Sequence, residues 1–301
     1  MAIHQPLEDL FFVDLDLPRE GFRRFIAPWV LRRGEAALVV DPGPRATVPV
    51  LLAALRELGV ERLGGILLTH IHIDHAGGAG LLLDRFPGVP VVCHPKGIPH
   101  LADPTRLWEG SRKILGDLAA AYGEIAVVPQ ESLIFGEALE LGAWRVSALE
   151  TPGHAAHHAS YIVGDVVFAG EVAGMRYELS SGVYQRPATP PVFHPDVYRA
   201  SIDRVAGVGA AHLCLGHYGL AKRPAEALEV AREQIGIWMA VAARHRGADE
   251  GAGEAILQEL LETDQHFARL RELPPDIQAR ERYFAFNSIA GVRGAVAAAT
   301  N

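Results

Sequence analysis

The first part of the chain alternates short apolar runs with segments in which apolar residues recur at helical spacing. Apolar runs of about four to eight residues, bounded by glycine, proline or charged residues, are typical of buried β-strands. Apolar residues that recur every three or four positions are typical of amphipathic helices. The expected strands are 10–17, 25–32, 36–40, 65–69, 89–93, 138–141, 144–149, 160–163, 166–169 and 211–215. The expected helices are 47–58, 79–86, 105–122 and 195–206.

The pattern changes after residue 222. From there on, the sequence is rich in Ala, Glu and Leu and keeps only helical periodicity. Three helices are expected, over 224–246, 253–264 and 276–299. The sequence therefore predicts a domain over residues 1–222, in which strands and helices alternate, and a helical C-terminal extension over residues 223–301.

Composition and charge favour a globular protein and argue against a nucleic-acid-binding or membrane-spanning one. The 301 residues are 49% apolar and 21% charged, which is ordinary for a globular chain. The formal net charge is −8, and no basic cluster with interleaved aromatic residues occurs, so nucleic acid is not an expected partner. The sequence has no apolar run of about 18 residues, so no membrane-spanning helix is expected.

The first residues and the two cysteines bear on the cellular compartment. Residues 1–9 lack a basic start and become acidic early, so we do not expect a signal peptide. Cys93 and Cys214 are the only cysteines, and each lies in a strand-like apolar run. We therefore expect two buried free thiols instead of a disulfide, and a cytoplasmic protein.

The segment from Thr69 to His75, which has the sequence Thr-His-Ile-His-Ile-Asp-His, carries the strongest chemical signal. Imidazole and carboxylate groups are ligands that suit zinc, iron and manganese. Residues two apart on extended backbone point to the same side, so His70 and His72 can bind one ion. Asp74 and His75 follow where small residues make the chain turn, so they can face a second ion. The segment predicts a metal site.

Four further motifs accompany this segment in a fixed order. Asp41 lies in Val-Val-Asp-Pro-Gly, His154 in Thr-Pro-Gly-His, Glu171 in Phe-Ala-Gly-Glu and His217 in Gly-His-Tyr-Gly. Together they resemble the metallo-β-lactamase superfamily over about residues 10–222, and in particular its glyoxalase II-like branch. The resemblance implies an α/β fold, an αββα sandwich with a metal site at one edge, followed here by the helical extension.

The resemblance also implies two sets of metal ligands and two divalent transition-metal ions. Zinc is the expected metal, with iron or manganese as alternatives. The first set is His70, His72 and His154, and the second is Asp74, His75 and His217. The bridging Asp of the family falls on Glu171, whose side chain has one more methylene group. Glu171 is therefore expected either to bridge the ions or to bind one of them.

Several residues are expected around the ligands. The resemblance implies that Asp41 orients a ligand histidine and that His158 supports a ligand or its loop. A proline-rich stretch after Glu171 is long enough to fold over the metal site. Tyr177, Tyr184 and Arg186 lie in or near this stretch and are expected to bind substrate.

Two functions are compatible with this set of residues. The first is a metal-dependent hydrolase in which a metal-bound hydroxide attacks an ester, thioester or lactone, while Asp74 helps the proton to move. No Gly-x-Ser-x-Gly elbow for a serine nucleophile occurs. The alternative is a mononuclear non-haem iron dioxygenase of the persulfide dioxygenase type, with His70, His154 and Glu171 as iron ligands. An inactive binding protein is not expected, because the metal motifs are intact.

The helical extension allows two roles. It is similar to the helical part with which glyoxalase II helps to bind glutathione, and Arg280 and Arg282 would then have to hold the glutathione carboxylates. We favour the simpler role, in which the extension packs on the sandwich or forms a homodimer. The expected partner is a small-molecule substrate, whose identity the sequence leaves open.

Overall fold

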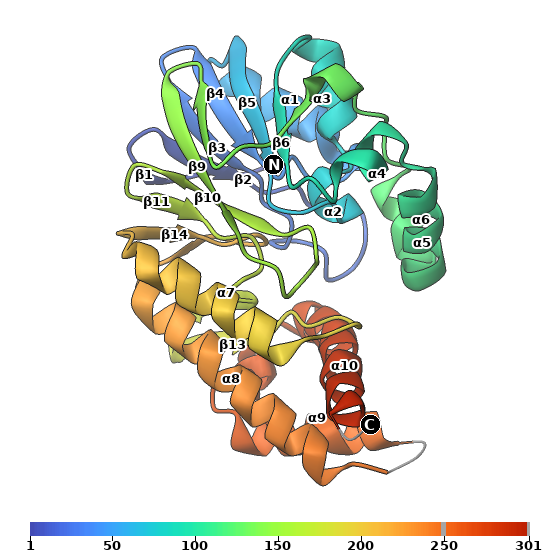
Figure 1. The fold of residues 1–301 in the computed structure, drawn as a ribbon. Coiled ribbons are helices and arrows are strands. Elements are labelled where there is room, and N and C mark those ends of the chain that lie inside the picture. The colour runs from blue at the N-terminus through green and yellow to red at the C-terminus, as the bar shows by residue number, and fades with distance from the viewer. Residues whose placement is uncertain (248–250, 300–301) are drawn as a thin grey trace.

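The computed structural model describes residues 1–247 and 251–299, and its first 222 residues form two β-sheets that lie face to face between helices (Figure 1). The first sheet has the order β1 (Ile3–Leu7), β2 (Leu10–Val13), β3 (Trp29–Arg33), β4 (Ala36–Val40), β5 (Arg62–Leu68), β6 (Val91–Cys93) and β7 (Leu133–Ile134). The second has the order β15 (Leu220–Ala221), β14 (His212–Cys214), β11 (Val166–Phe168), β10 (Ala159–Val163), β9 (Trp144–Glu150) and β8 (Ala138–Leu141). Strands β4 to β7 are parallel, and so are β11 and β14.

The two sheets enclose an apolar core and are also joined by polar side chains. The Tyr161 hydroxyl donates a hydrogen bond to the Leu68 carbonyl oxygen (2.8 Å) across the sandwich. The Trp29 indole N–H donates to the carbonyl oxygen of Leu215 (2.9 Å) in the same way. Buried side chains from both sheets fill the space between them, among them Leu38, Val40, Leu67, Val146, Phe168 and Cys214. The expected free thiols are confirmed, since Cys93 and Cys214 are both buried and unpaired.

Short helices connect the strands. They are α1 (Val48–Glu57), α2 (Ile73–Ala76), α3 (Ala79–Arg85), α4 (Ile98–Ala102), α5 (Thr105–Leu115), α6 (Asp117–Tyr122), α7 (Pro195–Val208) and the 3₁₀ helices η1 (Arg45–Thr47) and η2 (Gln130–Ser132). The stretch expected to be helical over 105–122 is helical, but it is divided into α5 and α6. Gly116 has a φ of +55°, a left-handed conformation that ends α5 and starts α6 in a new direction.

A hairpin of β12 (Met175–Leu179) and β13 (Gly182–Arg186) was not among the expected strands. Charged residues interrupt its apolar pattern, and the extension neutralises two of those charges. Arg176 lies 3.5 Å from Glu226, and the Arg186 guanidinium lies 2.6 Å from the Glu281 carboxylate. The hairpin is thus a mostly buried element, and two of its ion pairs are made with the end of the chain, while Arg176 also pairs with Glu178 within the hairpin (3.2 Å).

The extension consists of α8 (Pro224–Arg244), α9 (Ala252–Thr263), η3 (Phe267–Glu272) and α10 (Pro275–Ala298) (Figure 1). The three α-helices correspond to the three expected from the sequence, whereas η3 was not expected. It packs on α7 and the hairpin of the same chain. The Gln234 side chain donates to the Gln185 carbonyl oxygen (2.7 Å), and the Gln185 side chain donates to the Ala227 carbonyl oxygen (2.9 Å). The αββα sandwich with a helical extension is therefore confirmed. Within residues 1–247 and 251–299, no helix combines the length and apolarity needed to cross a bilayer.

Candidate metal centre

The predicted metal ligands meet at one edge of the sandwich, where four strands end. His70, His72, Asp74 and His75 follow β5, and α2 begins within this segment. The other ligands follow strands of the second sheet: His154 comes after β9, Glu171 after β11 and His217 after β14. Because β4, β5 and β6 run parallel, as do β11 and β14, their carboxyl ends open on the same edge. The structure brings all seven predicted ligands together.

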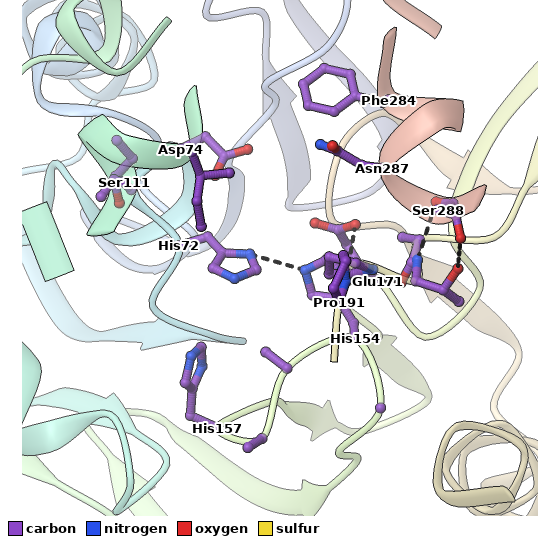
Figure 2. A pocket seen from close by; sticks show the side chains of 18 of the residues that line it. His72, Asp74, Ser111, His154, His157, Glu171, Pro191, Phe284, Asn287 and Ser288 are labelled. Carbon is purple, nitrogen blue, oxygen red and sulfur yellow. Dashed lines mark hydrogen bonds and ion pairs between the residues drawn. The ribbon is translucent and has the colours of Figure 1, made fainter. Parts of the chain in front are cut away.

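The candidate ligand atoms form three groups, of which two match the sets expected from the sequence and the third joins Asp41 to His70 and His75. Within each group, the candidate ligand atoms lie no more than 4.8 Å apart. The first of the two matching groups is His70, His72, His154 and Glu171, and the second is Asp74, His75 and His217. In the first group, His72 Nδ1 lies 3.0 Å from His154 Nε2 (Figure 2).

The carboxylate of Glu171 lies between the two groups. Its Oε1 is 3.6 Å from His70 Nε2, 3.3 Å from His75 Nε2 and 3.2 Å from His217 Nε2. Its Oε2 is 3.4 Å from His154 Nδ1. The longer side chain of glutamate therefore reaches both sets from this backbone position.

The backbone around Glu171 is held by neighbouring side chains. The Glu171 N–H donates to His158 Nε2 (3.0 Å), and the Tyr198 hydroxyl donates to the Glu171 carbonyl oxygen (2.7 Å). The other ring nitrogen of His158 bonds the Thr151 hydroxyl (2.9 Å). Gly170 precedes this position with a φ of +55°, and a Cβ there would lie 2.3 Å from His158 Nε2. His158 thus holds the loop that presents Glu171, in line with its expected supporting position.

Asp41 lies behind the metal motif and contacts two parts of it. Its carboxylate accepts hydrogen bonds from the Thr69 N–H (2.8 Å) and the Thr69 hydroxyl (2.6 Å). The same carboxylate lies 3.1 Å from His75 Nδ1. The Thr69 hydroxyl is also 3.0 Å from His70 Nδ1. These contacts fix the Nδ1 side of both rings and turn their Nε2 atoms towards the centre.

The hydrogen bonding of the histidine nitrogens at the centre indicates whether a metal ion fits there. The Nε2 atoms of His70 and His75 are buried and lack a hydrogen-bond partner, although the Glu171 carboxylate is nearby. Buried polar nitrogens are normally paired. A divalent ion between these nitrogens and the carboxylates would satisfy them, so the residues fit a metal centre.

The pKa shifts of His70, His72 and Glu171 suit metal binding, whereas that of His75 opposes it. Burial, followed by the neighbouring histidines, lowers the pKa of His70 and of His72 well below the usual value, which favours the neutral rings. Burial also lowers the pKa of His75, but Asp74 and the hydrogen bonds to Asp41 and Glu171 outweigh it and raise that pKa well above its usual value, so a metal ion has to displace a proton from this ring. Burial alone would raise the pKa of Glu171, but His154 and His217 outweigh it and lower that pKa well below its usual value. Neutral imidazoles and ionised carboxylates are the forms that coordinate metals.

A cavity of about 820 Å³ opens above the centre, and the extension supplies part of its wall. Figure 2 shows Phe284, Asn287 and Ser288 of α10 on one side and Ser111 of α5 on another, with Glu171 and the histidines between them. The sequence predicts only a helix, over 276–299, around Phe284. Its place in the cavity depends on tertiary packing, so no local motif could have revealed it.

Of the three residues expected to bind substrate, the structure places one in the cavity and two outside its described lining. Arg186 lines the cavity, whereas Tyr177 and Tyr184 do not belong to its described lining. The Tyr177 hydroxyl donates to the Arg24 carbonyl oxygen (2.6 Å), and the Tyr184 hydroxyl donates to Glu281 (3.1 Å). Both tyrosines are buried within the packing of the hairpin. For them, the prediction of a substrate-binding position is corrected by the geometry.

The last helix also supports a predicted ligand through a column of rings. The Phe25 ring stacks on the His217 ring, with centroids 4.1 Å apart, and on the Phe284 ring at 5.3 Å. The Arg280 guanidinium lies 4.3 Å from the Phe25 ring centroid. His217 is therefore held on one face by residues that depend on α10.

Replacing Asp41 with asparagine should lower metal affinity about 10–100-fold, the usual cost of losing a partner that orients a ligand. The substitution keeps the size of the side chain but removes a carboxylate oxygen that faces both Thr69 and His75. Competition with a chelator measures the affinity. Asp84→Asn, at an exposed position on α3, is the matched control. Equal metal affinity for Asp41→Asn and the control would contradict the role of Asp41.

Comparison with known proteins identifies the family. The family model described as "Metallo-beta-lactamase superfamily" matches residues 22–217. The chain is 34% identical over 167 residues to the metallo-beta-lactamase fold-containing protein ST1585 of Sulfurisphaera tokodaii, which covers 54% of this chain and 62% of that protein. It is 30% identical over 196 residues to a hydroxyacylglutathione hydrolase of Xylella fastidiosa, covering 64% and 60%. The matches thus span about three fifths of the length of these curated relatives.

Solved structures agree with this result. The crystal structure of ST1585 superimposes with a TM-score of 0.63 and 26% identity, covering 88% of this chain and 99% of that one. The metallo-beta-lactamase family protein TTHA1429 of Thermus thermophilus covers 98% and 95%, with a TM-score of 0.65. Its 22% identity supports the fold alone. The family model, the sequence relatives and the structures lead to one conclusion, that the chain belongs to the metallo-β-lactamase superfamily.

Proposed function

We propose that the chain is a metal-dependent hydrolase that acts on an ester, thioester or lactone of a small molecule. The observation that carries this proposal is the position of the Glu171 carboxylate, within 3.6 Å of nitrogens from both ligand sets and at the base of a cavity. The hydrolase names of the sequence relatives support the reaction class. Zinc remains the expected metal.

The bound ions would supply Lewis acidity and a water molecule whose pKa is lowered to about 7. The residues of this chain would position the reaction around them. His70, His72 and His154 would hold one ion, Asp74, His75 and His217 the other, and Glu171 would bridge them. Asp74 lines the cavity, and its Oδ2 lies 3.8 Å from His75 Nε2, so it can also accept a proton beside the reacting carbonyl.

The iron dioxygenase alternative explains fewer of the contacts. It needs only His70, His154 and Glu171, and it gives no role to the group formed by Asp74, His75 and His217. The hydrolase uses both groups, and we favour it for that reason. One iron per chain with oxygen uptake and no hydrolysis would instead support the dioxygenase. A cytoplasmic location and a homodimer formed through the extension stay predictions from the sequence.

Protein purified without added metal is expected to contain up to two transition-metal ions per chain, measured by elemental analysis. A panel of 4-nitrophenyl esters, thioesters and lactones should then reveal hydrolysis. Asp74→Asn should lose most of this activity and part of the metal, while Asp84→Asn keeps both. A metal content well below one ion per chain, or no hydrolysis by fully loaded protein, would contradict the proposal.

A further inference from the structure

Part of the apolar side of helix α5 faces the cavity: Leu107, Trp108 and Leu115 also pack against the core, whereas Ile114 is 72% exposed. None of the residues of α5 is buried, which is unusual for a helix that carries several large apolar side chains. Leu107, Ser111 and Ile114 lie four and three residues apart, so they share one face of the helix. All three line the cavity. The apolar face of α5 is therefore available to a ligand.

A second apolar wall comes from the proline-rich segment and from α7. Val192 is 82% exposed, Val197 is 42% exposed, and Ile114 of α5 is 72% exposed. All three line the same cavity, together with Pro190 and Pro191. Large apolar side chains exposed around one concave site mark a surface that a ligand covers.

The charged groups of the cavity are at its base and rim or are already paired. Asp74 and Glu171 belong to the metal centre. Arg186 is paired with Glu281 at 2.6 Å, and Lys96 and Arg106 are exposed. Among the described lining residues, Arg106 is the one charged side chain on α5, and the lining residues Pro190, Pro191, Val192 and Val197 are uncharged, so both walls are mainly apolar.

The arginines considered for glutathione binding are used elsewhere. Arg280 pairs with Glu281 (2.9 Å) and donates to the Gly21 carbonyl oxygen (2.6 Å). Arg282 pairs with Glu254 on the surface. Neither arginine is among the described lining of the cavity. The exposed Lys96 and Arg106 also line the cavity and can pair with a carboxylate, so the preference for an apolar substituent rests on Ile114, Val192 and Val197.

We propose, building on the hydrolase function, that the substrate carries a long apolar acyl chain. The reacting carbonyl would lie over the metal centre, and the chain would extend between the α5 face and the segment from Pro190 to Val192. A cavity of about 820 Å³ can hold such a chain. Each methylene group that enters it should improve kcat/KM by about fourfold, mainly through KM.

A series of 4-nitrophenyl esters from acetate through butanoate and octanoate to dodecanoate tests the inference, at concentrations below micelle formation. For the native chain, kcat/KM should rise steeply with acyl length until the chain outgrows the cavity. Ile114→Ser and Val192→Ser should flatten this rise, lowering kcat/KM for the dodecanoate ester far more than for the acetate ester. Both positions are largely exposed, so neither substitution disturbs the core.

Val127→Ser is the matched control, because Val127 is 58% exposed but outside the described lining of the cavity. Binding of butanoate, octanoate and dodecanoate by calorimetry adds a readout that needs no turnover. Hydrolysis without any dependence on acyl length, or a control that behaves like Ile114→Ser, would overturn the inference and leave the hydrolase function standing. Length-dependent binding without hydrolysis would support the apolar site and overturn the hydrolase function. If the protein neither binds these carboxylates nor hydrolyses the esters, both the inference and the hydrolase function are overturned.

Discussion

Glu171→Ala is expected to empty at least one metal site and to abolish most of the hydrolysis. The loss of metal affinity should exceed the roughly 10–100-fold that an outer partner of a ligand contributes, because this carboxylate lies against histidines of both sets. Elemental analysis after dialysis, together with turnover of the best ester, measures the effect. Glu140→Ala is a matched control, because the Glu140 side chain is 75% exposed.

The conservative variant refines this test. Glu171→Asp shortens the side chain by one methylene group, while the backbone is still held by His158 and Tyr198. The carboxylate should then fall short of at least one set, so the variant should fold and retain fewer ions than the native chain. Native metal content and turnover in both Glu171→Asp and Glu171→Ala would show that Glu171 is not a ligand.

Glu281→Ala is expected to lower the free energy of unfolding by about 3–5 kcal/mol, the usual cost of breaking a buried ion pair. The Glu281 side chain is fully buried and lies against Arg186 at 2.6 Å and Arg280 at 2.9 Å. Its removal would leave two buried guanidinium groups without their carboxylate. Unfolding in urea measures the change.

The surface pair of Glu254 and Arg282 provides the matched control in the same extension. Glu254→Ala should cost less than about 1 kcal/mol, because exposed ion pairs contribute little. Because Arg186 lines the cavity, Glu281→Ala should also impair turnover in the fraction that remains folded. Equal stability of the two variants would contradict the importance of the buried network.

The pH dependence of stability provides an independent check on Glu281. Burial by itself raises the pKa of this carboxyl group, but Arg186 and Arg280 outweigh burial and lower the pKa below its usual value. A lowered folded-state pKa contributes stability that is present above the unfolded value of about 4.3 and is lost as the pH falls through the folded value. Glu281→Gln should therefore lack this part of the acid-induced loss of stability.

The sequence revealed the candidate ligands because each one lies in a short local pattern at a strand end. Three imidazoles and a carboxylate between His70 and His75 leave few other interpretations, and His154, Glu171 and His217 each follow a small residue after an apolar run. The structure brings these residues together at distances that suit metal binding. Local sequence patterns therefore predicted those site residues that directly follow the end of a strand.

The rest of the site depends on contacts that no local pattern contains. The sequence places Tyr177 and Tyr184 in or near a proline-rich stretch, whereas the structure forms a hairpin that buries both rings. Phe284 and Asn287 line the cavity because α10 packs on α8 and is bonded to the hairpin through Glu281. These positions are set by tertiary packing, which the spacing of residues along one element does not encode.

The contacts that attach α10 to the first strands have a consequence for the order of folding. Arg280 bonds the Gly21 carbonyl oxygen and Arg23 bonds Asp276, across sequence separations of 259 and 253 residues. Closing such long loops costs more chain entropy than closing the short connections of the sandwich, and contacts of this kind slow folding. The ring column on His217 depends on the same contacts. The ligand-bearing strand ends can thus form from nearby segments, whereas the wall that encloses the substrate is completed by the longest-range contacts in the fold.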